Sequence, residues 1–244
     1  MRAPKDDTSS VRRLAFYATP EHACSYLARR TARTLFADPN AALDNHTYSR
    51  LALYGFRRSG GHIYRPSCPG CDACVPVRIP VADFRPNRSQ RRTWRRNGDL
   101  QVRERPARYD PEHFALYQAY MRQRHPGGGM DNADPTQYTE FLTSDWSDTR
   151  FVEFRLGREL LSVAVIDLLE TGFSAVYTFF DPGHARRGLG TYAVLWEIDR
   201  TRRAGLPWLY LGYWIKESPR MRYKDQFQPL EQFREGRWLP LPAP

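Results

Sequence analysis

The chain has 244 residues, of which 41% are hydrophobic and 14% aromatic, enough for the packed core of one large domain or two small ones. Its net charge of +10 arises in the first 100 residues, which hold 18 basic and 8 acidic side chains, whereas the rest holds 19 of each. No apolar run is long enough to span a bilayer, and residues 1–13 lack the apolar core of a signal peptide. We therefore expect a cytoplasmic protein without membrane partners.

The basic part of the chain is expected to form a small α+β domain over residues 1–105, beginning with a frayed tail. Four segments have the pattern of regular structure: a strand at 14–17, a helix at 41–53, strands with tight turns at 56–84, and a strand at 100–105. Among these segments lie the two features that give this domain its chemistry, a basic helix and a group of cysteines.

The basic helix is predicted to start at a cap formed by Asn87 or Ser89 and to end at Arg96, before Asn97 and Gly98. Its arginines recur at helical intervals, so most guanidinium groups share one face. Six arginines follow one another without an acidic residue: Arg85, Arg88, Arg91, Arg92, Arg95 and Arg96. A solvated charge run is the alternative, but the same domain interleaves further arginines with aromatic side chains, a combination that contacts phosphates and stacks on unpaired bases. We predict that this face binds RNA; DNA is not expected.

The cysteines are Cys68, Cys71 and Cys74, at intervals of three, and the distant Cys24. In a reducing compartment disulfides are not expected, which leaves metal binding or burial as free thiols. Four thiolates suit zinc, although zinc sites more often use two separated pairs, and the triple run also resembles iron–sulfur ligation. The sequence leaves zinc, an iron–sulfur cluster and no metal all open.

The second domain is predicted over residues 106–244, where the charges balance. Its regular segments are a helix opened by Asp110 and Pro111, a helix at 135–142, strands at 150–156, 159–168 and 173–180, a helix carrying Tyr192, Leu195, Trp196 and Ile198, and a strand at 208–215. The three consecutive strands are joined by short turns and are expected to form an antiparallel meander. The triple glycine at 127–129 is a candidate mobile loop.

A basic glycine loop at 186–190 joins the meander to the following helix. Strand, glycine loop, helix and strand form an anion-binding arrangement, because backbone N–H groups at a helix start are free to meet oxygens. The loop resembles the pyrophosphate loop of the Gcn5-related acetyltransferase fold, except that Ala185 stands where Gln or Arg is usual. A simple helix start is the alternative, but the elements on both sides favour an acetyltransferase-like α+β domain with a mixed sheet and flanking helices. No signature of a covalent nucleophile is present.

Long phrases of the chain closely resemble the aminoacyl-tRNA–protein transferases, and among them the bacterial branch that joins leucine to proteins beginning with Asp or Glu. The resemblance spans about residues 17–231. It rests on CSYLARRTARTLF (24–36), the cysteine segment at 54–84, RSQRR (88–92), VYTFFDPGHARRGLGTYAVLWEID (176–199) and LPWLYLGYWIKESPRMRYKDQFQPLE (206–231).

This resemblance implies a transfer reaction with two partners, leucyl-tRNA and a protein with N-terminal Asp or Glu, which marks that protein for N-degron degradation. The free α-amine would attack the ester that joins leucine to the tRNA. No ATP and no cofactor are required, because the ester is already activated. A model α-amine titrates near pH 7.7 to 8.0, so only a mild base is needed.

The candidate site residues follow from placing this reaction beside the glycine loop. Asp181 is the first candidate for holding or deprotonating an α-amine, with a cap beside Pro182 as the alternative, and Tyr177, Tyr213 and Tyr223 are alternative proton relays. The other candidates fall into three groups: Arg186, Arg187, Gly188 and Gly190 for the tRNA acceptor end, beside the arginine helix; Arg57, Arg58, Arg222 and Lys224 for the acceptor's carboxylate; and Phe179, Phe180 and Trp214 for the leucine side chain.

Three other functions remain open from the sequence. Transfer of arginine would require a carboxylate in the aminoacyl pocket, whereas an apolar lining favours leucine. An acyl-CoA N-acetyltransferase is disfavoured by Ala185 and by the basic first domain. A non-enzymatic, metal-containing RNA-binding module would leave the acetyltransferase-like half unexplained.

Overall fold

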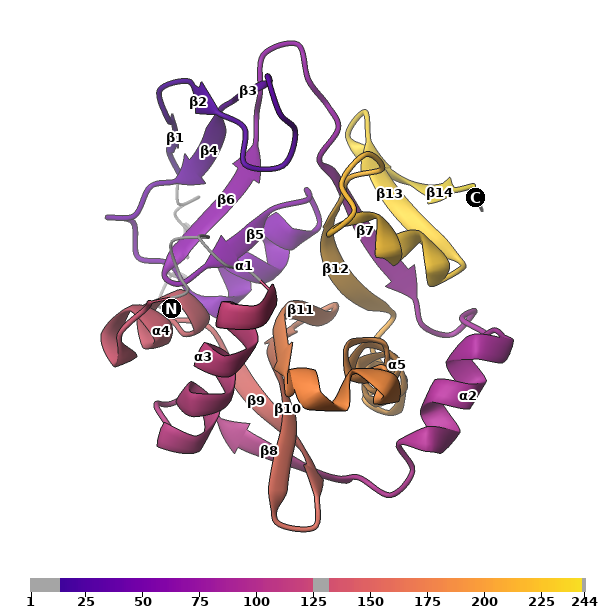
Figure 1. Ribbon diagram of the computed structural model, residues 1–244. Coiled ribbons are helices and arrows are strands. Elements are labelled where there is room, and N and C mark those ends of the chain that lie inside the picture. Colours follow the sequence, from indigo (N-terminus) through magenta and orange to yellow (C-terminus); the bar gives the residue numbers. More distant parts are fainter. Residues whose placement is uncertain (1–13, 125–131, 243–244) are drawn as a thin grey trace, which may run out of the picture.

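The computed structural model describes residues 14–124 and 132–242 and shows a mixed α+β protein built on one large sheet (Figure 1). Eight strands form this sheet in the order β14-β13-β7-β12-β11-β10-β9-β8. Their bounds are β7 Val75–Pro80, β8 Gln101–Pro106, β9 Thr149–Leu156, β10 Glu159–Leu169, β11 Gly172–Phe180, β12 Trp208–Trp214, β13 Leu230–Arg234 and β14 Arg237–Leu241. Neighbouring strands are antiparallel except β11 and β12, which are parallel.

Helices cover both faces of the large sheet. On β10, Ala164 belongs to one core and its neighbours Val163 and Val165 to another, because successive residues of a strand point to opposite faces. The first core lies under α5 (Leu189–Arg203), with α2 (Arg88–Arg96) alongside it. The second core lies under α3 (Pro111–Arg124) and α4 (Pro135–Leu142).

The parallel strands β11 and β12 separate soon after they meet. Their pairing covers only 172–174 on β11 and 208–210 on β12. At Gly172 a Cβ would lie 1.9 Å from the Trp208 carbonyl oxygen, so this close approach requires glycine. We call the diverging parts, 175–180 of β11 and 211–214 of β12, the fork. Because α5 contacts both strands, it covers one side of the fork.

The first part of the chain forms a smaller sheet at the upper left of Figure 1, in the order β1-β4-β6-β5. Its elements are β1 Phe16–Ala18, β4 Thr34–Ala37, β5 Arg57–Ser59 and β6 His62–Pro66, together with the β2 His22–Ala23 and β3 Thr31–Ala32 pair and α1 Asn45–Ala52. A third core joins it to the large sheet, where Tyr48 and Ile63 pack with Leu169 and Tyr210. Strands β7 and β8 precede residue 106, so the large sheet contains strands from both sides of the predicted domain boundary, which itself stays a prediction.

Most of the predicted elements are present. The helix predicted at 135–142 has these bounds, and the meander β9-β10-β11 is antiparallel as expected. Asn87 caps α2 in a capping box with Gln90. The predicted tail at 1–13 and the glycine loop at 127–129 lie outside the described residues. Among the described residues, no helix is long and apolar enough to cross a membrane.

The hairpin of β13 and β14 and the two 3-10 helices, η1 (Pro182–Arg187) and η2 (Arg222–Gln226), were not predicted. The hairpin turn has positive φ at Glu235 (51°) and Gly236 (78°). A turn that needs two positive φ angles usually carries Asn-Gly or Asp-Gly, so a glutamate at its first position obscured the signal.

Candidate active site

Arg57 lies at the root of the fork. Its guanidinium group donates to the Ala175 carbonyl of β11 at 2.5 Å and to the Tyr210 carbonyl of β12 at 3.4 Å. Gly212, with φ of 78°, makes room for it, since a Cβ there would lie 2.7 Å from Arg57 Nη1. The register of β12 against β7 also shifts between Tyr210 and Gly212. The local backbone is therefore shaped around this cation.

Lys224, on η2, is a second cation buried beside the fork. Its Nζ donates to the Tyr213 carbonyl at 2.8 Å and to Met221 Sδ at 3.6 Å. Burial, and after it the nearby charge of Arg57, lowers the pKa of Lys224 to about 7. Within the described parts of the chain, neither Lys224 nor Arg57 forms an ion pair with a carboxylate. The two cations are thus placed to receive an anion from outside.

Glu197, on α5, is a buried carboxyl group that the sequence analysis missed. Its side chain is fully buried, and neither of its oxygens has a hydrogen-bond partner among the described residues. Burial raises the pKa of Glu197 to about 8, against the opposing influence of Arg57. A sequence signal existed, because Glu197 shares its helix face with Ala193 and Thr201 at intervals of four, and that face is otherwise small or apolar.

The three candidate tyrosines differ in their availability. Tyr213 is 4% exposed, and its hydroxyl donates to the Gly55 and Tyr64 carbonyls at 3.1 and 3.2 Å, which ties the small sheet to the large one; its role as a proton relay stays a prediction. Tyr177 contacts Met121 Sδ at 3.4 Å, and burial raises its pKa. Tyr223 is 42% exposed and lies within electrostatic reach of Glu197, so it is the best placed of the three.

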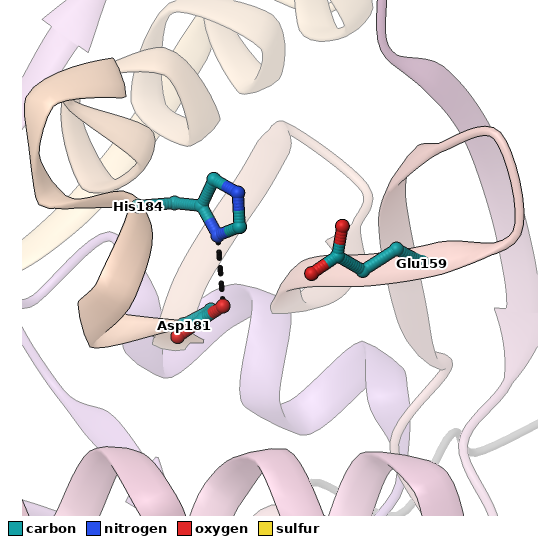
Figure 2. A group of neighbouring side chains, drawn as sticks. All are labelled: Glu159, Asp181 and His184. Carbon is teal, nitrogen blue, oxygen red and sulfur yellow. Dashed lines mark hydrogen bonds and ion pairs between the residues drawn. The ribbon is translucent and has the colours of Figure 1, made fainter.

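Asp181 directly follows β11 and forms a partly exposed group with His184 and Glu159 (Figure 2). It accepts the Gly183 N–H at 2.8 Å and lies 2.8 Å from His184 Nδ1, so the predicted cap is confirmed. A carboxylate that orients an imidazole is an arrangement suited to proton transfer. The sequence analysis did not name His184, although the Asp-x-x-His spacing was visible. Exposed groups of this kind are common without an ion, so we assign no metal to them.

The glycine loop and the arginine helix are hydrogen-bonded to each other. Arg96 donates to the Arg186 carbonyl, and Asn97 Nδ2 donates to the Arg187 carbonyl at 2.9 Å. Gly188 adopts a left-handed conformation with φ of 68° and begins α5 without a side-chain cap from the described residues. The two elements predicted to contact tRNA therefore form one continuous surface.

The arginines on this surface differ in exposure and in whether a carboxylate already engages them. All six predicted arginines from Arg85 to Arg96 are exposed, and so is Arg186. Arg187, in contrast, is engaged by Asp99 in a pair of 2.9 Å bonds, so a phosphate would have to displace a carboxylate there.

Among the candidates for the acceptor's carboxylate, the structure separates Arg57 and Lys224 from Arg58. Arg58 is wrong in this role, because its guanidinium group is fully engaged by Asp167 at 2.6 and 2.7 Å, with both side chains completely buried. Arg222 is exposed on η2, and its carbonyl accepts the Trp214 indole N–H at 3.2 Å.

The aromatic candidates for contact with the leucine side chain lie in two different environments. Phe179 is fully buried under α3 and α4 and packs edge-on against Tyr117 with ring centroids 5.5 Å apart, so it lies in the core, and its contact with a leucyl side chain stays a prediction. Phe180 is the last residue of β11, and its ring lies beside Gly190. A Cβ on Gly190 would lie 3.4 Å from this ring. Trp214 ends β12 and is partly buried. Phe180 and Trp214 therefore mark the two tips of the fork.

Comparison with known proteins places this geometry in a family. The model of the C-terminal part of arginine-tRNA-protein transferases matches residues 112–234, and that of the N-terminal part matches residues 22–92. The chain belongs to the arginine-tRNA-protein transferase family. Similar proteins include two aspartate/glutamate leucyltransferases. The one from Nitrosococcus oceani is 53% identical, and the alignment covers 91% of this chain and 94% of that protein. The one from Pseudomonas fluorescens is 52% identical, with coverages of 96% and 99%.

Solved structures resemble this family member at much lower identity. The structure of L-PGS from Bacillus licheniformis is 10% identical, with a TM-score of 0.48 over 68% of this chain and 61% of that chain. The FemX crystal structure is 8% identical, with a TM-score of 0.44 over 82% and 79%.

The cysteines of this transferase family member come together without forming a compact group. Cys74 is influenced electrostatically by Cys68, Cys24 and Cys71, and burial, followed by these neighbours, raises the pKa of Cys74 to about 12. Backbone N–H groups of Leu27 and Arg33 point at Cys24 and Cys68 Sγ, both at 3.4 Å. In the described chain, three or more metal-ligand atoms lie within 4.8 Å of one another only at Glu159, Asp181 and His184. Metal binding by the cysteines stays a prediction.

Proposed function

We propose that this chain transfers leucine from leucyl-tRNA to the α-amine of proteins that begin with Asp or Glu, in the cytoplasm, as a step toward their degradation. The observation that carries the proposal is the pair of cations at the fork, the half-buried Arg57 and the buried Lys224, which have no carboxylate partner among the described residues. An acceptor whose first residue is acidic supplies that carboxylate. Relatives at about 50% identity are aspartate/glutamate leucyltransferases, which supports the same reaction.

In this reaction the acceptor's amine nitrogen bonds to the leucyl carbonyl carbon, and the bond from that carbon to the ribose oxygen breaks. The amine loses one proton and the ribose oxygen gains one, so the protein has only to relay a proton. Arg57 and Lys224 hold the acceptor's side chain, while Phe180 and Trp214 contact the leucyl side chain at the tips of the fork. Positioning accounts for much of the rate enhancement, because the ester is already activated.

The tRNA is proposed to lie along α2 and the glycine loop. In this proposal the acceptor end of tRNA lies beside the fork and the helix that follows the loop, where the resemblance of the glycine loop to acetyltransferases would place coenzyme A. The hydrogen bonds from Arg96 and Asn97 to the glycine loop support one continuous path from the arginine helix to the fork. Phosphates of the acceptor stem meet the exposed arginines, and the terminal ribose reaches α5.

Arginine transfer is the second candidate. A buried carboxyl group is what a guanidinium side chain would require, and Glu197 lies within electrostatic reach of the fork residue Arg57. The apolar tips at Phe180 and Trp214 favour leucine instead.

A single assay separates these functions. The protein is incubated with a reporter bearing N-terminal Glu and a mixture of charged tRNAs, and the new N-terminus is identified by mass spectrometry. Added leucine supports the proposal, and added arginine supports the second candidate. No addition by fresh, reduced protein would refute both. A matched reporter with N-terminal Gln tests whether the carboxylate is required.

We further propose that the four cysteines, Cys24, Cys68, Cys71 and Cys74, hold zinc or an iron–sulfur cluster. The N–H groups directed at two of the sulfurs support this, since hydrogen bonds of this kind are common around metal thiolates. Elemental analysis and the visible absorption spectrum of anaerobically prepared protein would distinguish zinc, iron and no metal.

A further inference from the structure

Glu197 occupies an unusual position for a carboxyl group. It lies on the face of α5 that covers the fork, seven residues beyond Gly190, or about 10 Å along the helix axis. Gly190 faces Phe180 at the tip of the fork, so Glu197 lies nearer its root. Arg57, which bridges the two strands there, is its electrostatic neighbour.

The burial of this carboxyl group is unfavourable in the free protein. Both oxygens lack hydrogen-bond partners among the described residues, and each buried unsatisfied group costs about 1–3 kcal/mol. Two other buried carboxylates of the same sheet are satisfied: Asp167 bonds to Arg58 and Thr149, and Glu153 bonds to Arg155 and His113. Packing alone would be served better by Gln or Leu, so the carboxyl group of Glu197 calls for a partner from outside the chain.

The chemistry of the fork restricts what that partner is. An unpaired carboxyl group accepts a cationic or N–H-donating group, and the partner must be small because Glu197 is fully buried. Tyr223, which is 42% exposed, lies within electrostatic reach of Glu197. Both proposed substrates carry a primary α-amine, and an acyl-CoA carries none at the corresponding atom.

We infer that Glu197 forms the subsite for a primary α-amine, either that of the leucyl group or that of the acceptor's N-terminus. The inference rests on the proposed function for the identity of its substrates. If the acceptor's amine binds there, Glu197 takes the proton that the amine loses, and the ribose oxygen gains a proton as it leaves. A carboxyl group with a pKa of about 8 exchanges a proton with an α-amine of pKa 7.7 to 8.0 at little free-energy cost. If the leucyl amine binds there, Glu197 positions the donor ester.

The test compares wild-type protein with Glu197→Gln, which keeps the shape and removes the ionisable carboxyl group. Thr201→Val is the matched control: Thr201 lies one turn further along the same face, and its hydroxyl bonds to the Glu197 carbonyl at 2.7 Å. Transfer to a Glu-initiated peptide is measured with two donors, leucyl-tRNA and tRNA charged with the α-hydroxy analogue of leucine. The ratio of kcat/KM for the two donors is independent of how much of a variant is folded.

Each outcome decides the inference. If the leucyl amine binds Glu197, the wild type prefers leucyl-tRNA about 10- to 100-fold and Glu197→Gln loses that preference, as expected for a charge-assisted hydrogen bond. If the acceptor amine binds there, the donor ratio is unchanged, but Glu197→Gln lowers kcat/KM about 10- to 100-fold with both donors and alters its pH profile. A Glu197→Gln variant that matches Thr201→Val and wild type in rate, ratio and pH profile overturns the inference.

The same measurements keep this inference separate from the proposed function. Leucine addition by the wild type tests the function alone, without reference to Glu197. If the wild type instead adds arginine, and Glu197→Gln abolishes that addition, the carboxylate holds a guanidinium side chain and the α-amine subsite is refuted. Glu197→Asp, which retracts the charge by one methylene, provides a second variant if the glutamine variant does not fold.

Discussion

Two sets of buried charges lie against the large sheet, and they differ in whether the chain itself supplies their partners. At the α4 end of the sheet, Arg58 and Asp167 bond to each other at 2.6 and 2.7 Å, and Thr149 and the Leu142 carbonyl satisfy their remaining groups. At the fork, Glu197 and Lys224 are just as buried but form no ion pair within the described residues. The first set is complete within the chain, and the second is not.

This difference separates structural from functional charges. A complete buried pair adds little net stability over an apolar pair, but it is destabilising to break, because the remaining partner is left uncompensated. Unpaired buried groups reduce stability in the free protein and are retained where a ligand completes them. The charges at the fork therefore support the proposed reaction site more directly than the sequence motifs do.

Breaking the complete pair should have the largest effect on stability. Asp167→Asn leaves the Arg58 guanidinium buried without a counter-charge, and we expect a loss of about 3–5 kcal/mol in the free energy of unfolding, measured by urea denaturation. Asp148→Asn is the control, since its pair with Arg150 is about 40% exposed on both sides and should contribute less than about 1 kcal/mol. Equal losses for the two variants would contradict the distinction between the sets.

The buried groups at the fork, Glu197 and Lys224, should each contribute to the pH dependence of the free energy of unfolding. Because Glu197 has a folded pKa of about 8, above its ordinary 4.5, the native state binds the proton more tightly, and stability falls as pH rises between these values. Lys224 acts in the opposite sense: its pKa is lowered from 10.5 to about 7, so stability rises with pH across that window. The groups facing them are Arg57 for both and Tyr223 for Glu197.

Glu197→Gln should remove the first contribution. Relative to this variant, wild-type stability is expected to decline by up to about 1.4 kcal/mol per pH unit between pH 4.5 and 8, as measured by urea denaturation at a series of pH values. Parallel curves for the two proteins would show that the carboxyl group titrates normally and is solvated. Lys224→Met should remove the second contribution. Relative to this variant, wild-type stability is expected to rise with pH above pH 7.

Lys224→Met should also weaken the reaction without unfolding the protein. Loss of a charge-assisted bond to the acceptor's carboxylate is expected to lower kcat/KM for a Glu-initiated peptide by about 10- to 100-fold, mainly through KM. A Gln-initiated peptide, which lacks the charge, should be affected less. Lys216→Met is the matched control, because Lys216 is exposed. Similar losses for both peptides would remove Lys224 from the acceptor site.

The sequence predicted the framework better than the site. Periodicity and turn residues located α2, α4 and the meander, because each is determined by local patterns such as the Asn87 cap. Charge clustering and the glycine loop also located the proposed tRNA surface. These features depend on residues close together in the chain.

The fork depended on contacts that no local pattern records. Arg57 and Arg58 are neighbours in the chain, yet one reaches the fork and the other is sequestered by Asp167, 109 residues away. Phe179 and Phe180 likewise separate, one into the core and one to the fork tip, because strand residues alternate between faces. Glu197 could be recognised as unpaired only after the residues around it were placed.

The smallest effects are expected from Arg88 and Arg92, which are exposed and form no ion pair within the described part of the chain. Arg88→Ala or Arg92→Ala should change the free energy of unfolding by no more than about 0.5 kcal/mol, since water already stabilises these charges. Each should weaken tRNA binding severalfold at low salt and reduce the slope of log affinity against log salt concentration by about 0.7 to 0.9, the contribution of one phosphate contact. Arg237→Ala, at an exposed position on β14, is the control. An unchanged slope in both α2 variants would show that their charge is a solvated face, and would leave the fork as the part of the molecule where unpaired charge indicates function.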